Sequence, residues 1–423
     1  MTINRREFIK RFPAALGSLA MAGRARAAGP AAGRVIVIGG GYGGATAAKY
    51  VKLLGPEIDV RLIERDSDFV SCPFSNLVLS GLTSIEQLTF SYKGLERHGV
   101  GVLHDEALEV DPVLRKVRLA SGGTLEYDRL IVAPGVDFEY DALPGLQDAR
   151  ARKSVLHAWS AGPQTTALRR QLESMRDGGV FVIHIPPAPY RCAPAPYERA
   201  CQVAYYFSKS KPRSKVLVLD ANEEVQSKRA LFSSAWNGPY KGIVEYRPNS
   251  ELVDVDAKTL TAKLVFEDVK ADVLNVLPPQ KAGAIARKLG LVTANGRWCG
   301  VNWLSMESEV QKGVHVLGDA TLAASQMPKS ATMANQHAKV CAAAVVALMR
   351  DRPVDPEPTM ANACYSFIDG TQAGHVATRH VYDAVSRTMA VVPGSASLSL
   401  RASETEGAEA RQWAKSIWAD TFE

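Results

Sequence analysis

The feature that most constrains the fold is a glycine-rich loop in the segment RVIVIGGGYGGATAAKYVKLL, which begins at Arg34. Residues 35–38 form a short apolar run typical of a buried strand, and an alanine-rich helical pattern follows the loop directly. A second apolar run, residues 59–63, ends at Glu64, where a carboxylate can accept hydrogen bonds from a ribose diol. The loop has the spacing G-x-G-x-x-G, with Gly39, Gly41 and Gly44. Because these glycines let the backbone approach a pyrophosphate at a helix N-terminus, the segment predicts a Rossmann-like domain that binds a dinucleotide.

Two later segments indicate which dinucleotide is bound. TLEYDRLIVAPG is a predicted strand closed by Gly135, and KGVHVLGDA is a short strand that ends in Gly318 and Asp319. They resemble the later motifs of glutathione-reductase-like FAD enzymes, in which the aspartate at the strand end bonds the ribityl chain of the flavin. Their order behind the glycine loop therefore indicates FAD rather than NAD.

Between these segments lies a second strand and helix unit with a different loop. Residues 180–185 are a predicted strand, residues 197–209 a helical stretch and residues 215–219 a further strand. The loop after the first strand reads IPPAPYRC, and its three prolines remove backbone donors and fix φ. We therefore expect no NAD(P)H site here. Cys192 ends the loop near the start of a helix, where the helix dipole favours a thiolate.

The predicted fold class is α/β, with two Rossmann-like domains and a C-terminal α+β domain. The second of them is an NAD-like domain that lacks the glycine loop. The expected boundaries are 1–28 for a signal peptide, 29–144 and 280–352 for the FAD-binding domain, 145–279 for the second domain and 353–423 for the C-terminal domain.

The charge of the chain is concentrated at its start. The formal net charge is +6, and residues 1–27 hold six basic residues and one acidic residue, so the rest is close to neutral. No basic cluster beyond the leader suits nucleic acid. Arg5, Arg6 and Lys10 precede a mild apolar run, and a small-x-small site lies near residues 27–28. We expect a twin-arginine export signal that is removed there, a periplasmic location, and no transmembrane segment.

The six cysteines do not form a metal-binding pattern, because none belongs to a C-x-x-C pair and no histidine has ligand spacing from them. We expect no metal site. Disulfides are the default in the periplasm, but spacing alone leaves the pairing open. Cys341 lies in a helical apolar pattern and is expected in the core, whereas Cys201 and Cys299 are either buried thiols or partners of each other.

The motifs together resemble the flavoprotein subunit of flavocytochrome c sulfide dehydrogenase, a close relative of sulfide:quinone oxidoreductase. The resemblance extends over nearly the whole mature chain and rests on SCPFSNLVLSG around Cys72, YRCAPAPYERA around Cys192, the Pro-Pro hinge, HVLGDA, MPKSATMANQHAK and NACYSF around Cys364. It implies an oxidoreductase with FAD bonded covalently to Cys72 and a redox disulfide between Cys192 and Cys364. Sulfide would be oxidised to sulfur or polysulfide. Since the chain has no C-x-x-C-H site, the resemblance implies haem c on a separate cytochrome c subunit.

Some assignments stay open at this point. The segment MPKSATMANQ is expected to open a helix whose amides face the flavin, which makes Met333 and Asn335 candidate cofactor-binding residues. Glu198 is a candidate proton shuttle. A sulfide:quinone oxidoreductase is disfavoured by the polar C-terminal tail, and a thiol-redox accessory of the Sox sulfur-oxidation system is the other alternative.

Overall fold

A parallel sheet built around the glycine-rich segment forms the first layer of the computed structural model, which describes residues 33–423. Its seven strands are in the order β21-β22-β23-β9-β1-β2-β5. The five parallel members are β1 (Arg34–Ile38), β2 (Asp59–Ile63), β5 (Gly101–Leu103), β9 (Arg129–Val132) and β23 (Val314–Val316), and the antiparallel edge is β22 (Glu307–Ser308) and β21 (Val301–Asn302). Because β1 and β9 are buried on both faces, they read as continuous apolar runs.

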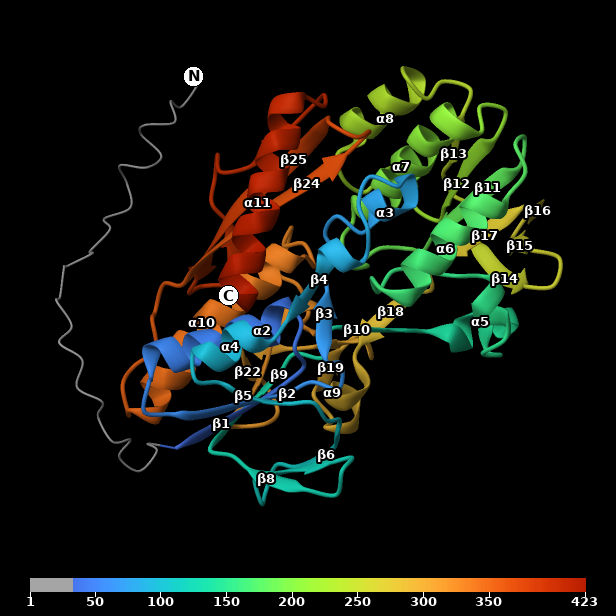
Figure 1. The fold of residues 1–423 in the computed structure, drawn as a ribbon. Coiled ribbons are helices and arrows are strands. Elements are labelled where there is room, and N and C mark those ends of the chain that lie inside the picture. The colour runs from blue at the N-terminus through green and yellow to red at the C-terminus, as the bar shows by residue number, and fades with distance from the viewer. Residues whose placement is uncertain (1–32) are drawn as a thin grey trace.

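Helices α2 (Tyr42–Leu54) and α10 (Ala331–Met349) pack against each other on one side of this sheet (Figure 1). The other side carries a small antiparallel sheet of β6 (Ala107–Asp111), β7 (Lys116–Leu119) and β8 (Thr124–Glu126). The glycine-rich loop lies between the end of β1 and the start of α2, at the carboxyl edge of the sheet, where α/β proteins bind their ligands.

A second parallel sheet follows, in the order β13-β12-β11-β17. Its strands are β11 (Val180–Ile185), β12 (Lys215–Asp220), β13 (Val244–Arg247) and β17 (Val273–Val276), its helices are α6 (Pro163–Ser174), α7 (Ala195–Ser210) and α8 (Arg229–Asn237), and β14 (Leu252–Asp256), β15 (Thr261–Leu264) and β16 (Asp268–Lys270) form a separate antiparallel sheet. The chain enters and leaves this part through β10 (Val136–Phe138) and β18 (Gln280–Ala282), which pair antiparallel.

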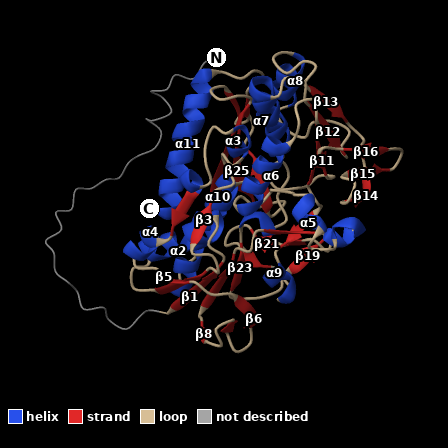
Figure 2. Cartoon of the chain, turned by 45° about the vertical axis from the view of Figure 1, so that its right-hand side comes forward, coloured by secondary structure: helices blue, strands red, loops and turns tan. Residues whose placement is uncertain are grey.

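The last part of the chain is an antiparallel sheet covered by a long helix. The strands are β24 (Thr359–Phe367), β25 (Ala373–Asp383), β26 (Thr388–Val391) and β27 (Ser397–Leu398), and the helix is α11 (Glu404–Phe422). Figure 2 shows α11 running along β25, and its C-terminal end reaches α2 in the first part. Ser403 caps α11 by accepting a hydrogen bond from the amide of Glu406 at 3.2 Å.

Shorter elements connect these parts. They are β3 (Asp68–Val70), α3 (Asn76–Ser80), β4 (Thr89–Ser91), α4 (Lys93–Arg97), α5 (Ala151–Ser154), α9 (Ala284–Lys288), β19 (Val292–Ala294) and β20 (Trp298–Cys299). The predicted α/β class is confirmed. The predicted export signal lies outside the described residues. Within residues 33–423, no helix is both long and apolar enough to cross a membrane.

Candidate active site

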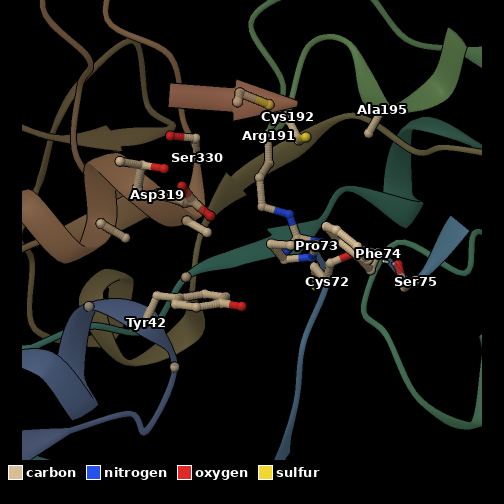
Figure 3. A pocket seen from close by; sticks show the side chains of 18 of the residues that line it. Tyr42, Cys72, Pro73, Phe74, Ser75, Arg191, Cys192, Ala195, Asp319 and Ser330 are labelled. Carbon is tan, nitrogen blue, oxygen red and sulfur yellow. Dashed lines mark hydrogen bonds between the residues drawn. The ribbon is translucent and has the colours of Figure 1, made fainter. Parts of the chain in front are cut away.

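A single pocket brings together residues from all three parts of the chain (Figure 3). The glycine loop contributes Gly41, Tyr42 and Gly43, and the loop before α3 contributes Cys72 to Asn76. The remaining wall consists of Gly135, Trp159, Arg191, Cys192, Glu198, Arg199, Gly318, Asp319, Ser330 to Thr332, Cys364, Tyr365 and Trp413, among others. Six of the predicted site residues outside the glycine loop therefore share one cavity: Cys72, Gly135, Cys192, Gly318, Asp319 and Cys364.

The glycine loop has the close backbone contacts that a dinucleotide cradle requires. A Cβ at Gly44 would lie 1.8 Å from the carbonyl oxygen of Gly39, so this position accepts no side chain. At Gly41, the nearest atom to an added Cβ is 3.9 Å away, on Phe69, and φ is −71°, so the protein itself leaves room there. Glu64 lies beyond the pocket wall and accepts hydrogen bonds from the amides of Gly40 at 2.6 Å and Asp66 at 3.1 Å. The open space beside Gly41 and the acid at the end of β2 fit the pyrophosphate and ribose of FAD.

Cys72 lies across the pocket from Asp319, in the loop between β3 and α3 (Figure 3). Its Sγ donates to the carbonyl oxygen of Trp159 at 3.7 Å. The Arg191 guanidinium donates to the same carbonyl and also hydrogen-bonds with the Cys72 sulfur. A thiol with a guanidinium at this end of the pocket can be held as a nucleophile.

Cys192 and Cys364 meet in the pocket although they come from different parts of the chain. Cys192 precedes α7 with φ of 58°, and its amide donates to the carbonyl oxygen of Lys329 at 2.8 Å. Cys364 lies in β24, opposite Val376 of β25. Both cysteines are free thiols in the structure, and their side chains hydrogen-bond to each other. The structure thus describes the pair in its dithiol form.

The hydrogen bond between the two thiols shifts their pKa values in opposite directions. The pKa of Cys192 is raised well above its ordinary value, because its side chain hydrogen-bonds with Cys364 and because it is buried. The same hydrogen bond lowers the pKa of Cys364 to about 7, against the effect of burial, and the charge of Lys228 lowers it further. Which of the two sulfurs carries the charge of the reduced pair stays a prediction. The effect of a helix dipole falls off within the first turn, and Cys192 lies before the Pro194 cap of α7.

Three of the amides that the prolines leave in the loop before α7 donate hydrogen bonds within the protein. The amide of Ala188 donates to Asn222 Oδ1 at 2.9 Å and that of Arg191 to Gln280 Oε1 at 2.9 Å. The amide of Cys192 donates to the carbonyl oxygen of Lys329. These three amides point at protein acceptors, so they do not form a cradle for a second pyrophosphate.

Buried charges surround the two cysteines. Burial raises the pKa of Glu198, whose carboxylate accepts hydrogen bonds from the amide of Phe367 at 2.8 Å and from Asn76 Nδ2 at 2.9 Å. Burial lowers the pKa of Arg199 to about 9, and that of Lys329 to about 8. Lys329 Nζ donates to the carbonyl oxygen of Asp319 at 3.0 Å, beneath the pocket. These cations make the cavity suited to an anionic substrate or cofactor group.

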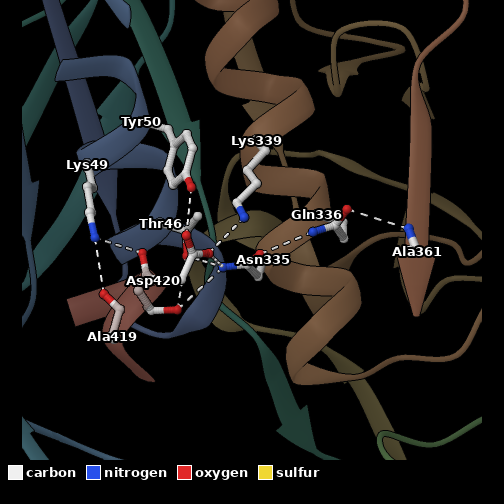
Figure 4. A network of polar contacts seen from close by, with 10 residues as sticks. Thr46, Lys49, Tyr50, Asn335, Gln336, Lys339, Ala361, Ala419 and Asp420 are labelled. Atoms are coloured by element: carbon white, nitrogen blue, oxygen red, sulfur yellow. Dashed lines mark hydrogen bonds and ion pairs between the residues drawn. The ribbon is translucent and has the colours of Figure 1, made fainter. Parts of the chain in front are cut away.

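The structure does not bring two of the predicted cofactor residues to the pocket. The Asn335 side chain donates to Thr46 Oγ1 at 3.0 Å and Asp420 Oδ2 at 2.8 Å, and so ties α10 to α2 and α11 (Figure 4). Met333 is buried in the core, and its amide donates to Ser330 Oγ, the cap of α10, at 3.1 Å. The first turn of α10 does line the pocket, through Ser330, Ala331, Thr332 and Ala334.

An aromatic wall closes the pocket on the side of α11. Trp418 Nε1 donates to Tyr42 Oη at 3.1 Å and to Ser71 Oγ at 3.0 Å. Phe69 stacks on Phe422 with ring centroids 4.7 Å apart. Trp413, which lines the pocket, and Trp418 are both half-buried, so this wall extends from the cavity to the molecular surface.

The other three cysteines lie in the core. Cys341 lies on the buried side of α10, as predicted, and Cys201 and Cys299 are buried free thiols in two different apolar clusters. The suggested pairing of Cys201 with Cys299 is therefore not present. Residues 33–423 contain no cluster of three metal-ligating side chains.

Sequence reasoning missed the buried cations around the cysteine pair. Lys228, Arg199 and Lys329 each stand in an unremarkable local sequence, because their role depends on neighbours from other parts of the chain. The sequence alone could have identified Arg191 as a site residue, because it directly precedes Cys192.

Three protein-family models match the chain. Residues 33–175 match the pyridine nucleotide-disulphide oxidoreductase family, residues 165–278 the central part of the sulfide dehydrogenase (flavocytochrome c) flavoprotein chain, and residues 356–422 the flavin-binding part of flavocytochrome c sulphide dehydrogenase. Cys192 falls in the second range and Cys364 in the third.

Individual relatives agree with these matches. The chain is 58% identical over 45 residues, 11% of its own length, to the sulfide dehydrogenase flavoprotein chain of Chlorobaculum thiosulfatiphilum, of which it covers 94%. It is 24% identical over 321 residues to the mitochondrial sulfide:quinone oxidoreductase of Mus musculus, covering 71% of this chain and 67% of that protein. Among solved structures, the sulfide:quinone oxidoreductase of Aquifex aeolicus superimposes with a TM-score of 0.73 at 18% identity, covering 92% of this chain and 91% of the other.

Proposed function

Because the chain belongs to the family of flavocytochrome c sulfide dehydrogenase flavoprotein chains, we propose that it is a FAD-dependent oxidoreductase that oxidises sulfide with a redox-active Cys192–Cys364 pair. The observation that carries the proposal is that both thiols line the pocket that the glycine loop also lines. A pair of thiols in one pocket can be oxidised to a disulfide, which is an electrophile for hydrosulfide.

The residues around the pocket fit FAD. Gly41 and Gly43 would hold the pyrophosphate, Glu64 the ribose and Asp319 the ribityl chain, and Cys72 would bond the flavin covalently. When bound, FAD supplies an acceptor that takes two electrons together and can release them one at a time. The remaining chemistry belongs to side chains of the pocket.

The oxidised pair would react with hydrosulfide by thiol–disulfide exchange. HS⁻ attacks one sulfur of the disulfide, the S–S bond breaks, and its electron pair leaves on the other cysteine as a thiolate. The attacked cysteine then carries the added sulfur as a persulfide. When the persulfide sulfur leaves as elemental sulfur or polysulfide, the two electrons of sulfide remain on the enzyme.

Glu198 and the buried cations support these steps. Arg191 and Lys228 offset the negative charge of the hydrosulfide and of the thiolate that is released. Glu198 lines the pocket beside both cysteines, and its raised pKa suits it to accept and return the proton of HS⁻.

We further propose that a cytochrome c subunit with haem c accepts the electrons, in the periplasm after twin-arginine export. The half-buried Trp413 and Trp418 of the pocket wall support an electron exit on the face of α11. A sulfide:quinone oxidoreductase is the second candidate, favoured by the 24% identity to the Mus musculus enzyme over 71% of this chain. A Sox-linked thiol-redox accessory would share the same cysteine pair.

An anaerobic sulfide titration tests the function. We expect about one sulfide to bleach each flavin, by two-electron stoichiometry, and reoxidation to be faster with cytochrome c than with a soluble quinone. Faster reoxidation of the flavin by the quinone would favour a sulfide:quinone oxidoreductase. No bleaching by sulfide would favour a Sox-linked thiol-redox accessory. NADH serves as the control donor and should not bleach the flavin, because three prolines remove backbone donors from the loop before α7.

A further inference from the structure

Lys228 is a buried ammonium group directly behind one of the two pocket cysteines. It precedes α8 with φ of 56°, and only 3% of its surface is exposed. Nζ donates to the carbonyl oxygen of Cys364 at 2.9 Å, to Ser366 Oγ at 3.0 Å and to the carbonyl oxygen of Gly374 at 3.0 Å. All three acceptors are neutral, so the hydrogen bonds are satisfied while the positive charge is not compensated.

No carboxylate pairs with this ammonium at ion-pair distance in the part of the chain that the structure describes. The charged and titratable groups that face Lys228 are Cys364, Glu198, Cys192 and Glu406. Those that face Cys364 are Cys192, Lys228 and Glu198. Lys228 is thus the cation that faces Cys364, and Glu198 already has two hydrogen-bond donors and a raised pKa.

A buried unpaired ammonium is costly unless an anion lies nearby. In the dithiol form, a thiolate on Cys364 supplies that anion, with Cys192 as the thiol that donates to it. In the disulfide form neither sulfur carries a charge, so Lys228 loses its counterion. The charge therefore stabilises the reduced pair more than the oxidised pair.

We propose that Lys228 is a positioning residue that stabilises the thiolate form of Cys364 and thereby makes the Cys192–Cys364 disulfide a stronger oxidant. The inference rests on the proposed function, in which this pair is a redox disulfide. Reduction then consumes two electrons and one proton: the S–S bond breaks, Cys192 takes the proton and Cys364 remains a thiolate. A reduced form that is stabilised in this way raises the reduction potential of the disulfide.

Variants at Lys228 separate charge from packing. Lys228→Gln keeps hydrogen-bond donors without the charge, Lys228→Met removes both, and Lys228→Arg keeps the charge. None is β-branched, so each tolerates the positive φ as well as lysine does. Lys211→Met is the matched control, because Lys211 is also buried and donates to backbone carbonyls, of Glu173 at 2.7 Å and of Met175, at the opposite end of α7.

The measurement uses the purified flavoprotein without sulfide. The reduced protein is pulsed with iodoacetamide over a range of pH, and alkylation of Cys364 is quantified by mass spectrometry. In the Gln and Met variants we expect the pH of half-maximal alkylation to rise by about one unit or more, the effect of losing a nearby opposite charge. The Arg variant and Lys211→Met should match the wild type.

The redox equilibrium with glutathione gives the second readout. The neutral variants should favour the disulfide about tenfold more than the wild type, which corresponds to about 30 mV. Unchanged alkylation and equilibrium in Lys228→Gln would overturn the proposal, and this variant decides the matter if Lys228→Met does not fold. Failure of the wild-type cysteines to form a disulfide with oxidised glutathione would instead overturn the proposed function, so the two failures are distinguishable.

Discussion

The side chains of Cys192 and Cys364 hydrogen-bond to each other, so two residues from different parts of the chain form one ionising unit. The amide of Cys192 donates a hydrogen bond to the carbonyl oxygen of Lys329, and Cys364 is fixed by its place in β24. Because β11, which precedes Cys192, and β24 belong to separate sheets, the unit exists only where the chain brings both cysteines into the pocket of the glycine loop.

The first prediction concerns this pair. Cys192→Ser and Cys364→Ser should each abolish sulfide-dependent bleaching of the flavin while flavin remains bound, because neither residue belongs to the glycine loop. Since the two sulfurs act as a unit, the double variant should be no slower than either single variant. Stopped-flow absorbance under anaerobic conditions measures the rate. Bleaching at the wild-type rate in either single variant would contradict a disulfide mechanism.

The second prediction concerns Cys72. Acid-denatured wild type should retain flavin on the peptide that contains Cys72, whereas Cys72→Ser should release it, because only a thioether survives denaturation. Mass spectrometry of the digested protein detects the modified peptide. The variants at Cys192 and Cys364 serve as controls and should keep the flavin attached. Complete release from the wild type would remove the covalent assignment.

The third prediction compares two glycines of the cradle. Gly44→Ala places a Cβ 1.8 Å from the carbonyl oxygen of Gly39, so β1 and α2 must separate, and we expect little folded protein. Gly41→Ala meets no protein atom closer than 3.9 Å, but its Cβ enters the pocket that the cofactor would fill. It should therefore fold and hold less FAD. The flavin-to-protein absorbance ratio measures FAD occupancy, and urea denaturation measures the stability of the fold. Full FAD occupancy in Gly41→Ala would argue against the proposed cradle.

The fourth prediction concerns the pH dependence of stability at Glu198. Burial raises its pKa above the ordinary value of 4.5, so between that pH and the folded pKa the folded protein binds more protons than the unfolded chain. The wild type should therefore lose stability relative to Glu198→Gln as pH rises from about 4.5 through the folded pKa. Urea midpoints at pH 5 and 8 for both proteins measure the difference.

Glu57 provides a control of opposite sign. Its hydrogen bond with Arg350 lowers its pKa, so the stability it contributes is present above its unfolded pKa and is lost as pH falls. Glu57→Gln should therefore lose stability relative to the wild type as pH rises. Equal trends in both variants would show that the Glu198 carboxyl is not shifted by burial.

The sequence by itself determined the parts of the protein that depend on contiguous residues. The strand, glycine loop and helix from Arg34 to Leu54 follow from apolar patterning and from the room that glycine leaves, and β11 and β12 were predicted almost to the residue. The prolines after Ile185 exclude a phosphate cradle through their own covalent structure. Such properties depend on neighbouring residues in the chain, so they can be predicted from the sequence.

Only the tertiary structure decided which groups surround the two thiols. Cys364 has an ordinary local sequence, and its lowered pKa comes from Cys192 on one side and Lys228 on the other, both far away along the chain. The role of Asn335 also depends on distant residues, because its side-chain amide donates hydrogen bonds to α2 and α11 and not to the pocket. Burial and charge act through space, and which residues share a buried space is fixed by how the sheets and helices pack, which no local pattern specifies.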